Sequence, residues 1–510
     1  MITITPSKLT LGDMRAMSNE HHEIRLDPSC FEAIGRGADA VALIAERGEP
    51  AYGVNTGFGR LANTHIPRDQ LELLQKNLVL SHAVGVGEPL SPEVVRLVLM
   101  LKIASLARGH SGVTSNLVNA LVTLLNKDVL PVIPSKGSVG ASGDLAPLAH
   151  MAAVLIGVGE VHIHGERASA LEGLAAAGLK VMVLRAKEGL ALLNGTQVST
   201  AIALRNLFSI EDLFGTAIVA GSMSVDAAAG SIAPFDARIH ELRGQHGQID
   251  AASAYRALLA DSGITVSHQD CEKVQDPYSL RCQPQVMGAC LDLIRNAAAT
   301  LEIEANAVSD NPLVFPDTLE VLSGGNFHAE PVAFAADTLA IAASEIGALA
   351  ERRIALLIDA TLSDLPPFLV RDGGVNSGFM IAHVTAAALA SENKTLAHPA
   401  SVDSLPTSAN QEDHVSMATF AARKLTDICA NVAGILAIEL LAATQGIDLR
   451  EPFRTSPRLA PVVELIRSKV PHYEIDHYLA PDIQNMIELV TAGKIAKHSP
   501  VAFASLGDSK

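Results

Sequence analysis

The stretch VSMATFAARKLTDICANVAGILAIELLAATQ, residues 415–445, consists mainly of Ala, Leu, Ile and Val, with one glycine and no proline. It predicts a helix about 45 Å long. Residues 329–359 and 377–398 carry the same pattern. Apolar residues occur almost all round these three expected helices, as is typical of helices that several neighbours or other subunits cover. We therefore expect a mainly α-helical protein built on a bundle of long helices.

Outside this bundle the helical pattern is shorter and strands are few. Ser91, Pro92 and Glu93 are typical of a helix start, and the apolar run that follows ends at Arg108 and Gly109. Alternation with period two occurs at ITIT, residues 2–5, and at EVHIHGE, residues 160–166. The glycines of RGHSGV, residues 108–113, indicate a domain boundary. We expect a smaller mixed N-terminal domain of residues 1–110 and a helical bundle domain of residues 111–510.

The charge balance excludes several classes of partner. The 510 residues include 38 Lys and Arg against 55 Asp and Glu, a formal net charge of −17, which repels nucleic acid and anionic lipid. The charge-free stretches hold polar groups that a bilayer would penalise. The N-terminus has no signal-peptide pattern, and five cysteines are too few and too irregular for a disulfide framework. We expect a soluble cytoplasmic protein with reduced thiols.

The stretch GSVGASGDLAPLAH, residues 137–150, has three glycines at intervals of three. It matches neither a phosphate loop, nor a dinucleotide fingerprint, nor a nucleophile elbow. One interpretation is a turn capped by Asp144 ahead of a helix. In the other, the Gly143 nitrogen closes a five-membered ring on the Ala141 carbonyl carbon, and loss of the Ser142 hydroxyl leaves an electrophilic methylene. Only glycine offers an unhindered nitrogen at such a bend.

This stretch resembles the segment of the aromatic amino acid ammonia-lyases in which Ala-Ser-Gly becomes 4-methylideneimidazole-5-one (MIO). The resemblance extends in order from about residue 50 to about residue 450. It is carried by YGVNTGFG (52–59), SHAVGVGEPL (81–90), EGLALLNGTQ (188–197), QDPYSLRCQPQVMG (275–288), SDNPLVF (309–315), SGGNFHAEPVA (323–333) and LPTSANQEDHVSM (405–417). Within the family these variants most resemble the members that act on histidine.

The resemblance implies non-oxidative deamination of L-histidine to trans-urocanate and ammonia, the first step of histidine catabolism. It implies that Ala141, Ser142 and Gly143 form MIO autocatalytically, without an external cofactor. It also implies a homotetramer whose active sites each draw residues from three chains. Either the substrate amine or its imidazole adds to the MIO methylene, and the sequence does not choose between them.

The resemblance further implies roles for individual residues. Tyr52 is the base that removes the β-proton of the substrate. Arg281 pairs with the substrate carboxylate, a task that suits a bidentate guanidinium. Phe327 lies against the MIO ring. The groups that hold the amine and the surroundings of the MIO carbonyl are Asn194, Tyr278 and Gln275.

His82 and Glu412 are expected to select the substrate. A carboxylate and an imidazole can satisfy the ring nitrogens of histidine, and a site built for those bonds rejects a ring that lacks them. Phenylalanine-using members tend to have apolar residues at the position of His82 and Gln at that of Glu412, whereas tyrosine-using members share the His. A tyrosine or phenylalanine ammonia-lyase or aminomutase of the same family is therefore the alternative. A non-catalytic relative is disfavoured because Tyr52 and the tripeptide are intact.

No metal site is expected. His162 and His164 fall on one face of the expected strand at residues 160–166, but no third ligand lies near them in sequence. The pair His21 and His22 lies among acidic residues and is typical of a solvated charged segment.

Overall fold

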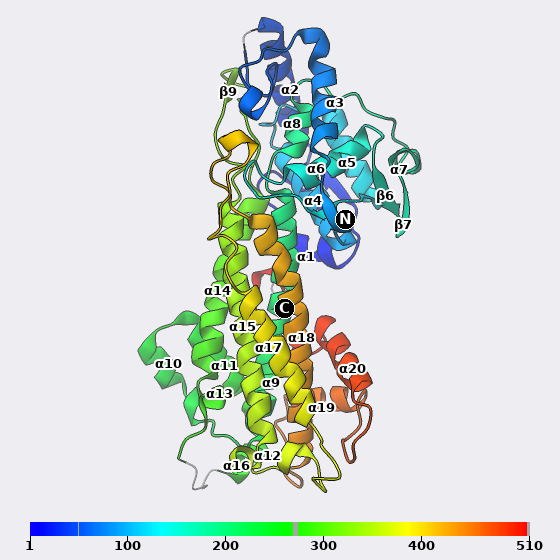
Figure 1. Cartoon of the computed structure of the whole chain (residues 1–510). Coiled ribbons are helices and arrows are strands. Elements are labelled where there is room, and N and C mark those ends of the chain that lie inside the picture. Colours follow the sequence, from blue (N-terminus) through cyan, green and yellow to red (C-terminus); the bar gives the residue numbers. More distant parts are fainter. Residues whose placement is uncertain (49, 269–273, 507–510) are drawn as a thin grey trace.

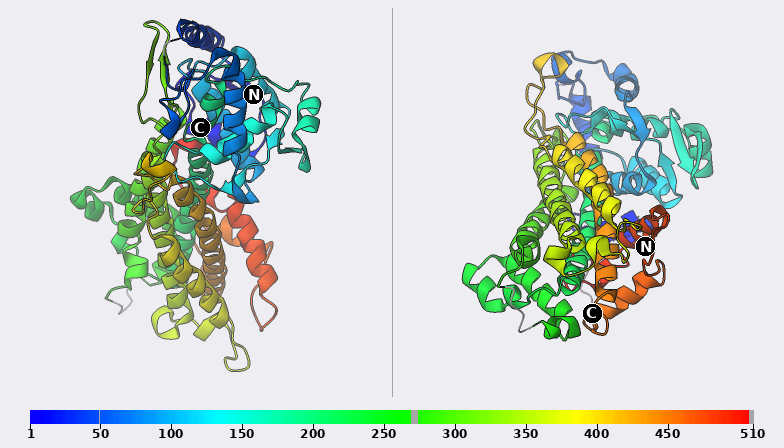
Figure 2. Two further views of the ribbon diagram at one scale, coloured as in Figure 1. Left: turned by 45° about the horizontal axis from the view of Figure 1, so that its top comes forward. Right: turned by 60° about the horizontal axis from the view of Figure 1, so that its bottom comes forward.

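The computed structural model describes residues 1–48, 50–268 and 274–506. A bundle of long helices runs through the molecule, and a region of shorter helices and small sheets lies at one end of it (Figure 1). The bundle helices are α9 (Gln197–Ala227), α14 (Gln283–Ala305), α15 (Glu330–Ile358), α17 (Met380–Leu396) and α18 (Ala418–Asp448). Helix α18 packs along α9 and α15, and the bundle keeps this arrangement from other directions (Figure 2). The expected mainly α-helical bundle is confirmed.

The three long helices expected from apolar runs are α15, α17 and α18. Two of them begin later than the apolar pattern, because α17 starts at Met380 and α18 at Ala418. At α18 the cause is local. Met417 has a left-handed backbone, and its N–H donates to the Val139 carbonyl at 2.9 Å, while the Ser416 hydroxyl donates to the Gly140 carbonyl at 3.0 Å. These residues dock on the glycine-rich segment instead of extending the helix.

Close packing explains why so many small residues occur in the bundle. A Cβ at Gly434 of α18 would lie 2.9 Å from the side chain of Leu389 on α17, so glycine lets these two helices approach each other. Helices α15 and α18 are long and apolar enough to cross a membrane, but 67% and 78% of their most apolar windows are buried inside the protein. They are core helices of the bundle.

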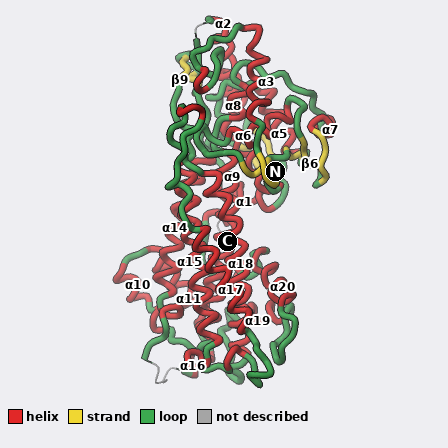
Figure 3. The backbone as a smooth tube through the Cα atoms, in the orientation of Figure 1, coloured by secondary structure: helices red, strands yellow, loops and turns green. Residues whose placement is uncertain are grey.

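The region at the end of the bundle contains most of the strands (Figure 3). Strands β1 (Ile2–Ile4) and β2 (Ile24–Leu26) are parallel. The antiparallel sheets are β3 (Val86–Pro89) with β5 (Pro134–Lys136), β4 (Val129–Pro131) with β6 (Glu160–Ile163) and β7 (Glu166–Ser169), and β8 (Leu313–Phe315) with β9 (Glu320–Leu322). The expectation of a strand at residues 2–5 is confirmed as β1.

The expectation of one strand over residues 160–166 is wrong in its extent, because this stretch forms β6, a turn and the start of β7. Strand β6 ends at Ile163, and His164 and Gly165 have positive φ angles of 51° and 88° in the turn that leads to β7. His162 and His164 therefore do not share one face of a strand. They are also absent from the groups of potential metal ligands found among the described residues.

In the described part of the chain, eight α-helices precede the bundle. They are α1 (Leu11–Asn19), α2 (Ser29–Arg47), α3 (Leu71–His82), α4 (Pro92–Leu106), α5 (Ser115–Asn126), α6 (Leu145–Leu155), α7 (Ala170–Ala176) and α8 (Glu188–Leu193). The helix expected after Ser91 is α4, although the Ser91 side chain makes no capping bond. Helix α3 contacts α6 and α8, and helix α4 contacts α5. The domain boundary near residue 110 stays a prediction.

The remaining helices surround the far part of the bundle (Figure 1). They are α10 (Ala237–Arg243), α11 (His246–Leu259), α12 (Gly263–Ser267), α13 (Tyr278–Arg281), α16 (Ala360–Ser363), α19 (Ala460–Arg467) and α20 (Ala480–Thr491). Among the described residues the free thiols are Cys30, Cys282, Cys290 and Cys429, as expected. Cys271 lies outside the described residues.

Candidate active site

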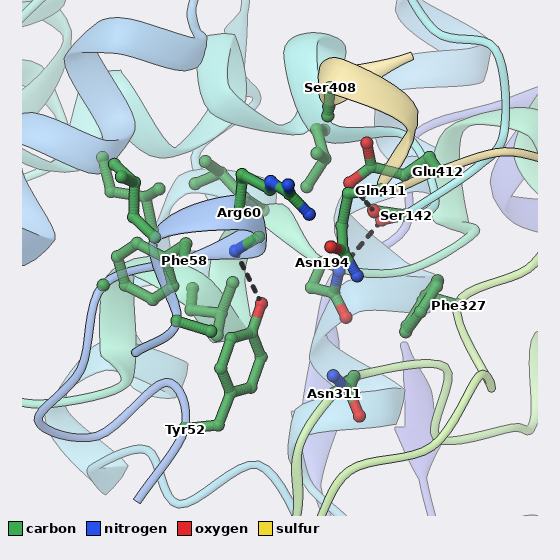
Figure 4. Close-up of a pocket in the computed structure, with 18 of the residues that line it drawn as sticks. Tyr52, Phe58, Arg60, Ser142, Asn194, Asn311, Phe327, Ser408, Gln411 and Glu412 are labelled. Atoms are coloured by element: carbon green, nitrogen blue, oxygen red, sulfur yellow. Dashed lines mark hydrogen bonds between the residues drawn. The ribbon is translucent and has the colours of Figure 1, made fainter. Parts of the chain in front are cut away.

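A cavity of ≈ 1190 Å³ lies where the bundle meets the region of shorter helices. Its lining comes from six separate segments: residues 52–66, the end of α3, the glycine-rich segment, residues 190–194, the loop that precedes α15 and the loop that precedes α18. Figure 4 shows part of this lining. Seven of the eleven site residues expected from the sequence line it, and they are Tyr52, His82, Ala141, Ser142, Asn194, Phe327 and Glu412.

The glycine-rich segment is a tightly held turn. Gly143 has a φ of +73°, and a Cβ there would overlap the carbonyl oxygen of Gly195. The two glycines pair as a parallel bridge, and the Asp144 N–H donates to the Gly195 carbonyl at 2.8 Å. Both the backbone conformation and the close approach therefore require glycine at position 143.

Asp144 anchors this turn to the bundle. It does not cap α6, which begins at Leu145 without a capping bond from a side chain. Its buried carboxylate instead accepts bonds from the Ser199 N–H at 2.8 Å, the Ser199 hydroxyl at 2.9 Å, the Ser138 hydroxyl at 2.9 Å and the Thr419 hydroxyl at 2.7 Å. The expected cap of α6 is thus wrong, and Asp144 caps α9 and fastens the turn to α18.

Ser142 faces the cavity between two polar side chains. Its carbonyl accepts a bond from Asn194 Nδ2 at 2.9 Å, and its hydroxyl donates to Glu412 Oε1 at 3.4 Å (Figure 4). Helices α6, α9 and α18 all begin within a few residues of this turn or of its bonding partners. Their positive ends therefore converge at the tripeptide.

Tyr52 lies on a loop that packs against α8. Its hydroxyl accepts a bond from the Gly59 N–H at 3.3 Å, and its ring meets Phe58 edge-on with centroids 6.4 Å apart. A Cβ at Gly53 would lie 2.7 Å from the Leu190 side chain, so glycine lets the loop approach α8. Figure 4 shows Tyr52 and Phe327 on opposite sides of the cavity, with Asn194 between them.

His82 is the last residue of α3 and presents a neutral ring. Its Nδ1 lies 2.9 Å from the Leu78 carbonyl, which can only accept, so Nδ1 carries the proton and Nε2 is left as an acceptor. Burial lowers the pKa of His82, while the bond to Leu78 opposes this shift. A neutral imidazole at this position can accept an N–H from a ligand.

Glu412 lies on the loop that precedes α18. The Thr407 N–H donates to its carbonyl at 2.8 Å and holds the loop closed. Its Oε2 is buried and has no hydrogen-bond partner in the described part of the chain, and the same holds for Asn194 Oδ1 and Gln197 Oε1. Of these three residues, Asn194 and Glu412 line the cavity beside the tripeptide, whereas Gln197 lies outside its lining.

A buried lysine, Lys102, holds the backbone of the segment that carries Asn194. Lys102 Nζ donates to the Asn194 carbonyl at 2.8 Å and to the Ala191 carbonyl at 3.2 Å. Burial lowers the pKa of Lys102 to about 7, and the carboxylates of Asp310 and Asp144 only partly oppose the shift. Lys102 fixes the backbone of Asn194, whose amide in turn holds Ser142.

Several residues of the cavity are not among those expected from the sequence. Arg60 is an exposed cation on its lining, one position beyond the YGVNTGFG motif, and Gln411 directly precedes Glu412. Asn311, His328 and His414 also line the cavity. All five lie inside or next to the quoted motifs, so their place in those motifs was the available signal.

Three expected site residues lie elsewhere. Gln275 is exposed in the loop before α13, and Tyr278 and Arg281 form the two ends of that helix. Helix α13 packs against α9, α14 and α15, away from α2 and α3 (Figure 1). Tyr278 is 70% exposed, and the Arg281 guanidinium lies over its ring at 4.7 Å. Within one chain these residues do not join the cavity.

The sequence and the fold of the chain are similar to those of known proteins. The chain is 74% identical to histidine ammonia-lyase of Burkholderia vietnamiensis over 505 residues, which cover 99% of this chain and 100% of the relative. Its fold matches the crystal structure of histidine ammonia-lyase from Trypanosoma cruzi at 42% identity with a TM-score of 0.90, covering 98% and 95% of the two chains.

A second solved structure, tyrosine aminomutase from Streptomyces globisporus, matches at 35% identity with a TM-score of 0.91 and covers 98% of this chain and 99% of its own. The model of the aromatic amino acid lyase family matches residues 9–468. The chain therefore belongs to the aromatic amino acid lyase family.

Proposed function

We propose that this chain is a carbon–nitrogen lyase that converts L-histidine to trans-urocanate and ammonia. The observation that carries the proposal is one cavity in which the Ala141-Ser142-Gly143 turn lies with Tyr52, His82 and Glu412. The 74% identity to histidine ammonia-lyases over the full chain supports the same substrate. In the reaction the Cα–N bond and one Cβ–H bond of histidine break, and a carbon–carbon double bond forms.

The residues around the tripeptide fit MIO formed from the chain itself. The left-handed Gly143, its contact with Gly195 and the bond from Asn194 to the Ser142 carbonyl hold the backbone in a tight bend. The unused acceptors of Asn194 and Glu412 lie beside it. When formed, MIO supplies an electron-poor methylene, the electrophile that makes loss of ammonia feasible at neutral pH.

The side chains of the cavity supply the remaining chemistry. Tyr52 removes the β-proton as general base. The Glu412 carboxylate or His82 Nε2 accepts the single N–H of a neutral substrate imidazole, and the two together accept both N–H groups of an imidazolium. These bonds orient the β-carbon towards Tyr52. Asn194 stabilises the Ser142 carbonyl as it gains electron density, and the helix ends around the turn add to this effect.

The carboxyl end of the substrate requires a cation. Arg281 serves this role from another subunit of a homotetramer. Tyr278 and Gln275 of the same subunit help to hold the substrate amine and the surroundings of the MIO carbonyl. The exposure of Tyr278 supports this arrangement, as does Arg281 Nε, which is buried and has no hydrogen-bond partner in the described chain. Exposed apolar residues on the bundle helices also suit subunit contacts, namely Phe334, Ile341, Ile381 and Phe420. The acidic chain and its relatives support a soluble cytoplasmic enzyme.

Subunit sharing predicts complementation between two inactive variants. We expect Ser142→Ala and Arg281→Ala each to lose histidine turnover alone, and the mixed oligomers from co-expression to regain it. About a quarter of the sites should combine an intact tripeptide with an intact Arg281 if chains assort at random. Turnover of the co-purified mixture measures this, and Arg243→Ala on α10 is the matched control for Arg281→Ala. A mixture as inactive as its two parents would place Arg281 in the site of its own chain.

The choice of substrate is tested at Glu412. We expect Glu412→Gln to lower kcat/KM for L-histidine by roughly 10- to 100-fold, because a neutral amide replaces a charged acceptor for the imidazole N–H. Glu392→Gln, on the exposed face of α17, should leave it unchanged. Initial rates with L-histidine, L-tyrosine and L-phenylalanine measure the effect. Preferential turnover of tyrosine or phenylalanine by the native chain would favour the alternative lyase or aminomutase.

A further inference from the structure

Three potential metal ligands without a part in the proposed reaction gather beside the cavity, and two of them, His328 and His414, line it. His328 and Glu330 lie at the start of α15, directly after Phe327, and His414 lies on the loop that carries Glu412. Their ligating atoms all lie within 4.8 Å of one another. The cluster thus joins the two segments that place Phe327 and Glu412 in the cavity.

The spacing of the cluster suits a shared ion. His328 Nδ1 and His414 Nε2 each lie 3.8 Å from Glu330 Oε2. This separation is too long for a hydrogen bond. An ion that forms bonds of about 2.1 Å to nitrogen and oxygen separates two ligands by roughly 3.4–4 Å, depending on the angle. The two imidazole rings are parallel within 3°, with centroids 5.7 Å apart, so a small closure of one ring brings all three atoms into bonding range.

The tautomer of His328 is the one that metal ligands have. Its Nε2 faces the His414 carbonyl at 3.3 Å, and because a carbonyl only accepts, Nε2 carries the proton. In the neutral ring Nδ1 then directs a lone pair towards Glu330. Such a bond from the remote nitrogen to a carbonyl is the usual support of a ligating histidine.

Glu330 has no other partner for the oxygen concerned. Its Oε2 is buried and makes no hydrogen bond to any residue that the structure describes. A carboxylate oxygen and an imidazole lone pair that face each other repel unless a cation lies between them. The convergence of Glu330 Oε2 and the His328 Nδ1 lone pair therefore calls for a positive charge, which a bound metal ion or a proton on the ring supplies.

We propose that His328 Nδ1, Glu330 Oε2 and His414 Nε2 bind one divalent transition-metal ion of the zinc class. Two imidazoles and one carboxylate are typical ligands of Zn²⁺, Co²⁺ and Ni²⁺, whereas Mg²⁺ and Ca²⁺ prefer oxygen alone. His414 is 71% exposed at its side chain, which gives the ion a path to the site. The bound ion links the Glu412 loop to the start of α15 and so stabilises one wall of the cavity.

Metal titration of the untagged full-length chain tests the site. After treatment with a chelator, the protein is titrated with Zn²⁺ by calorimetry and with Co²⁺ by visible absorption, which reports nitrogen ligation directly. Histidine is left out because it binds these ions itself. We expect one ion per chain, and a melting temperature that rises on adding Zn²⁺.

The variants assign the ligands. His328→Ala and His414→Ala should each weaken Zn²⁺ binding by more than about tenfold, and both should lose the Zn²⁺-dependent rise in melting temperature. His162→Ala, a partly buried histidine on β6, is the matched control and should bind like the native chain. Melting temperatures without metal establish that the variants are folded.

Absence of saturable binding in the native chain would overturn the proposal, and so would native-like binding by both cluster variants. Because the readout is binding and not turnover, this failure leaves the proposed lyase reaction untouched. Conversely, a chain that binds one ion at this cluster and turns over no amino acid would overturn only the proposed reaction.

Discussion

Replacing Ser142 by alanine lowers turnover of L-histidine by more than about 10³-fold, since the electrophile carries much of the acceleration that an enzyme of this kind supplies. An alanine side chain has no hydroxyl to lose, so the methylene cannot form. The fold should survive, because the side chain of Ser142 makes one long hydrogen bond, to Glu412 at 3.4 Å. Absorbance of trans-urocanate measures the rate.

The control for this variant is another serine near the turn in sequence. Ser135→Ala, on β5, leaves the tripeptide intact and should turn over histidine at a rate close to native. A Ser142→Ala chain that keeps most of its activity would show that the tripeptide is a structural turn and that the chemistry lies elsewhere in the cavity.

Replacing Tyr52 by phenylalanine lowers kcat by roughly 10²- to 10⁴-fold, the usual contribution of a general base. The phenylalanine ring keeps the edge-on contact with Phe58, and the hydroxyl loses its bond from the Gly59 N–H, the one bond that it makes among the described residues. Because the proton is transferred in the transition state, the effect should fall on kcat more than on KM. Steady-state kinetics with L-histidine separates the two constants.

Tyr478→Phe is the matched control, since Tyr478 is 82% exposed and lies outside the cavity. It should keep the native kcat. If Tyr52→Phe raises KM and leaves kcat unchanged, Tyr52 binds the substrate and another group removes the proton.

The long helices were predictable because their apolar pattern is continuous over many turns. The residues at which these helices start were not predictable. Ser416 and Met417 continue the residue pattern of α18 in sequence, but in the structure they bond to the glycine-rich segment instead of extending the helix. The hairpin of β6 and β7 was missed for a similar reason. Its turn depends on the positive φ angles of His164 and Gly165, which no alternation of residue types reveals.

The identities of the site residues were predictable where they lie in the motifs that the chain shares with the ammonia-lyases. Tyr52, Ser142 and Glu412 come from distant segments, and only the fold brings them together. Lys102 was not predictable, since a lysine in an apolar helix ordinarily reaches solvent. In the structure Lys102 is buried, and the carbonyls of Asn194 and Ala191 accept hydrogen bonds from its ammonium group.

The placement of Arg281 could not be predicted from spacing along one chain. The motif around Arg281 identifies it as a candidate site residue, but α13 lies away from the cavity. Local sequence patterns do not reveal where other subunits lie. The single-chain fold therefore brings together the residues that we propose as the source of the electrophile, the base and the imidazole contacts, and leaves the carboxylate contact to the assembly that we propose.

The central claim is that the backbone of Ala141, Ser142 and Gly143 reacts with itself. The intact mass of the purified native chain, measured by mass spectrometry under denaturing conditions beside Ser142→Ala, tests it most directly. The account predicts a native chain lighter than its sequence mass by two water molecules, and a variant that lacks at least the loss of the serine hydroxyl. A native mass equal to that of the unmodified sequence would contradict it.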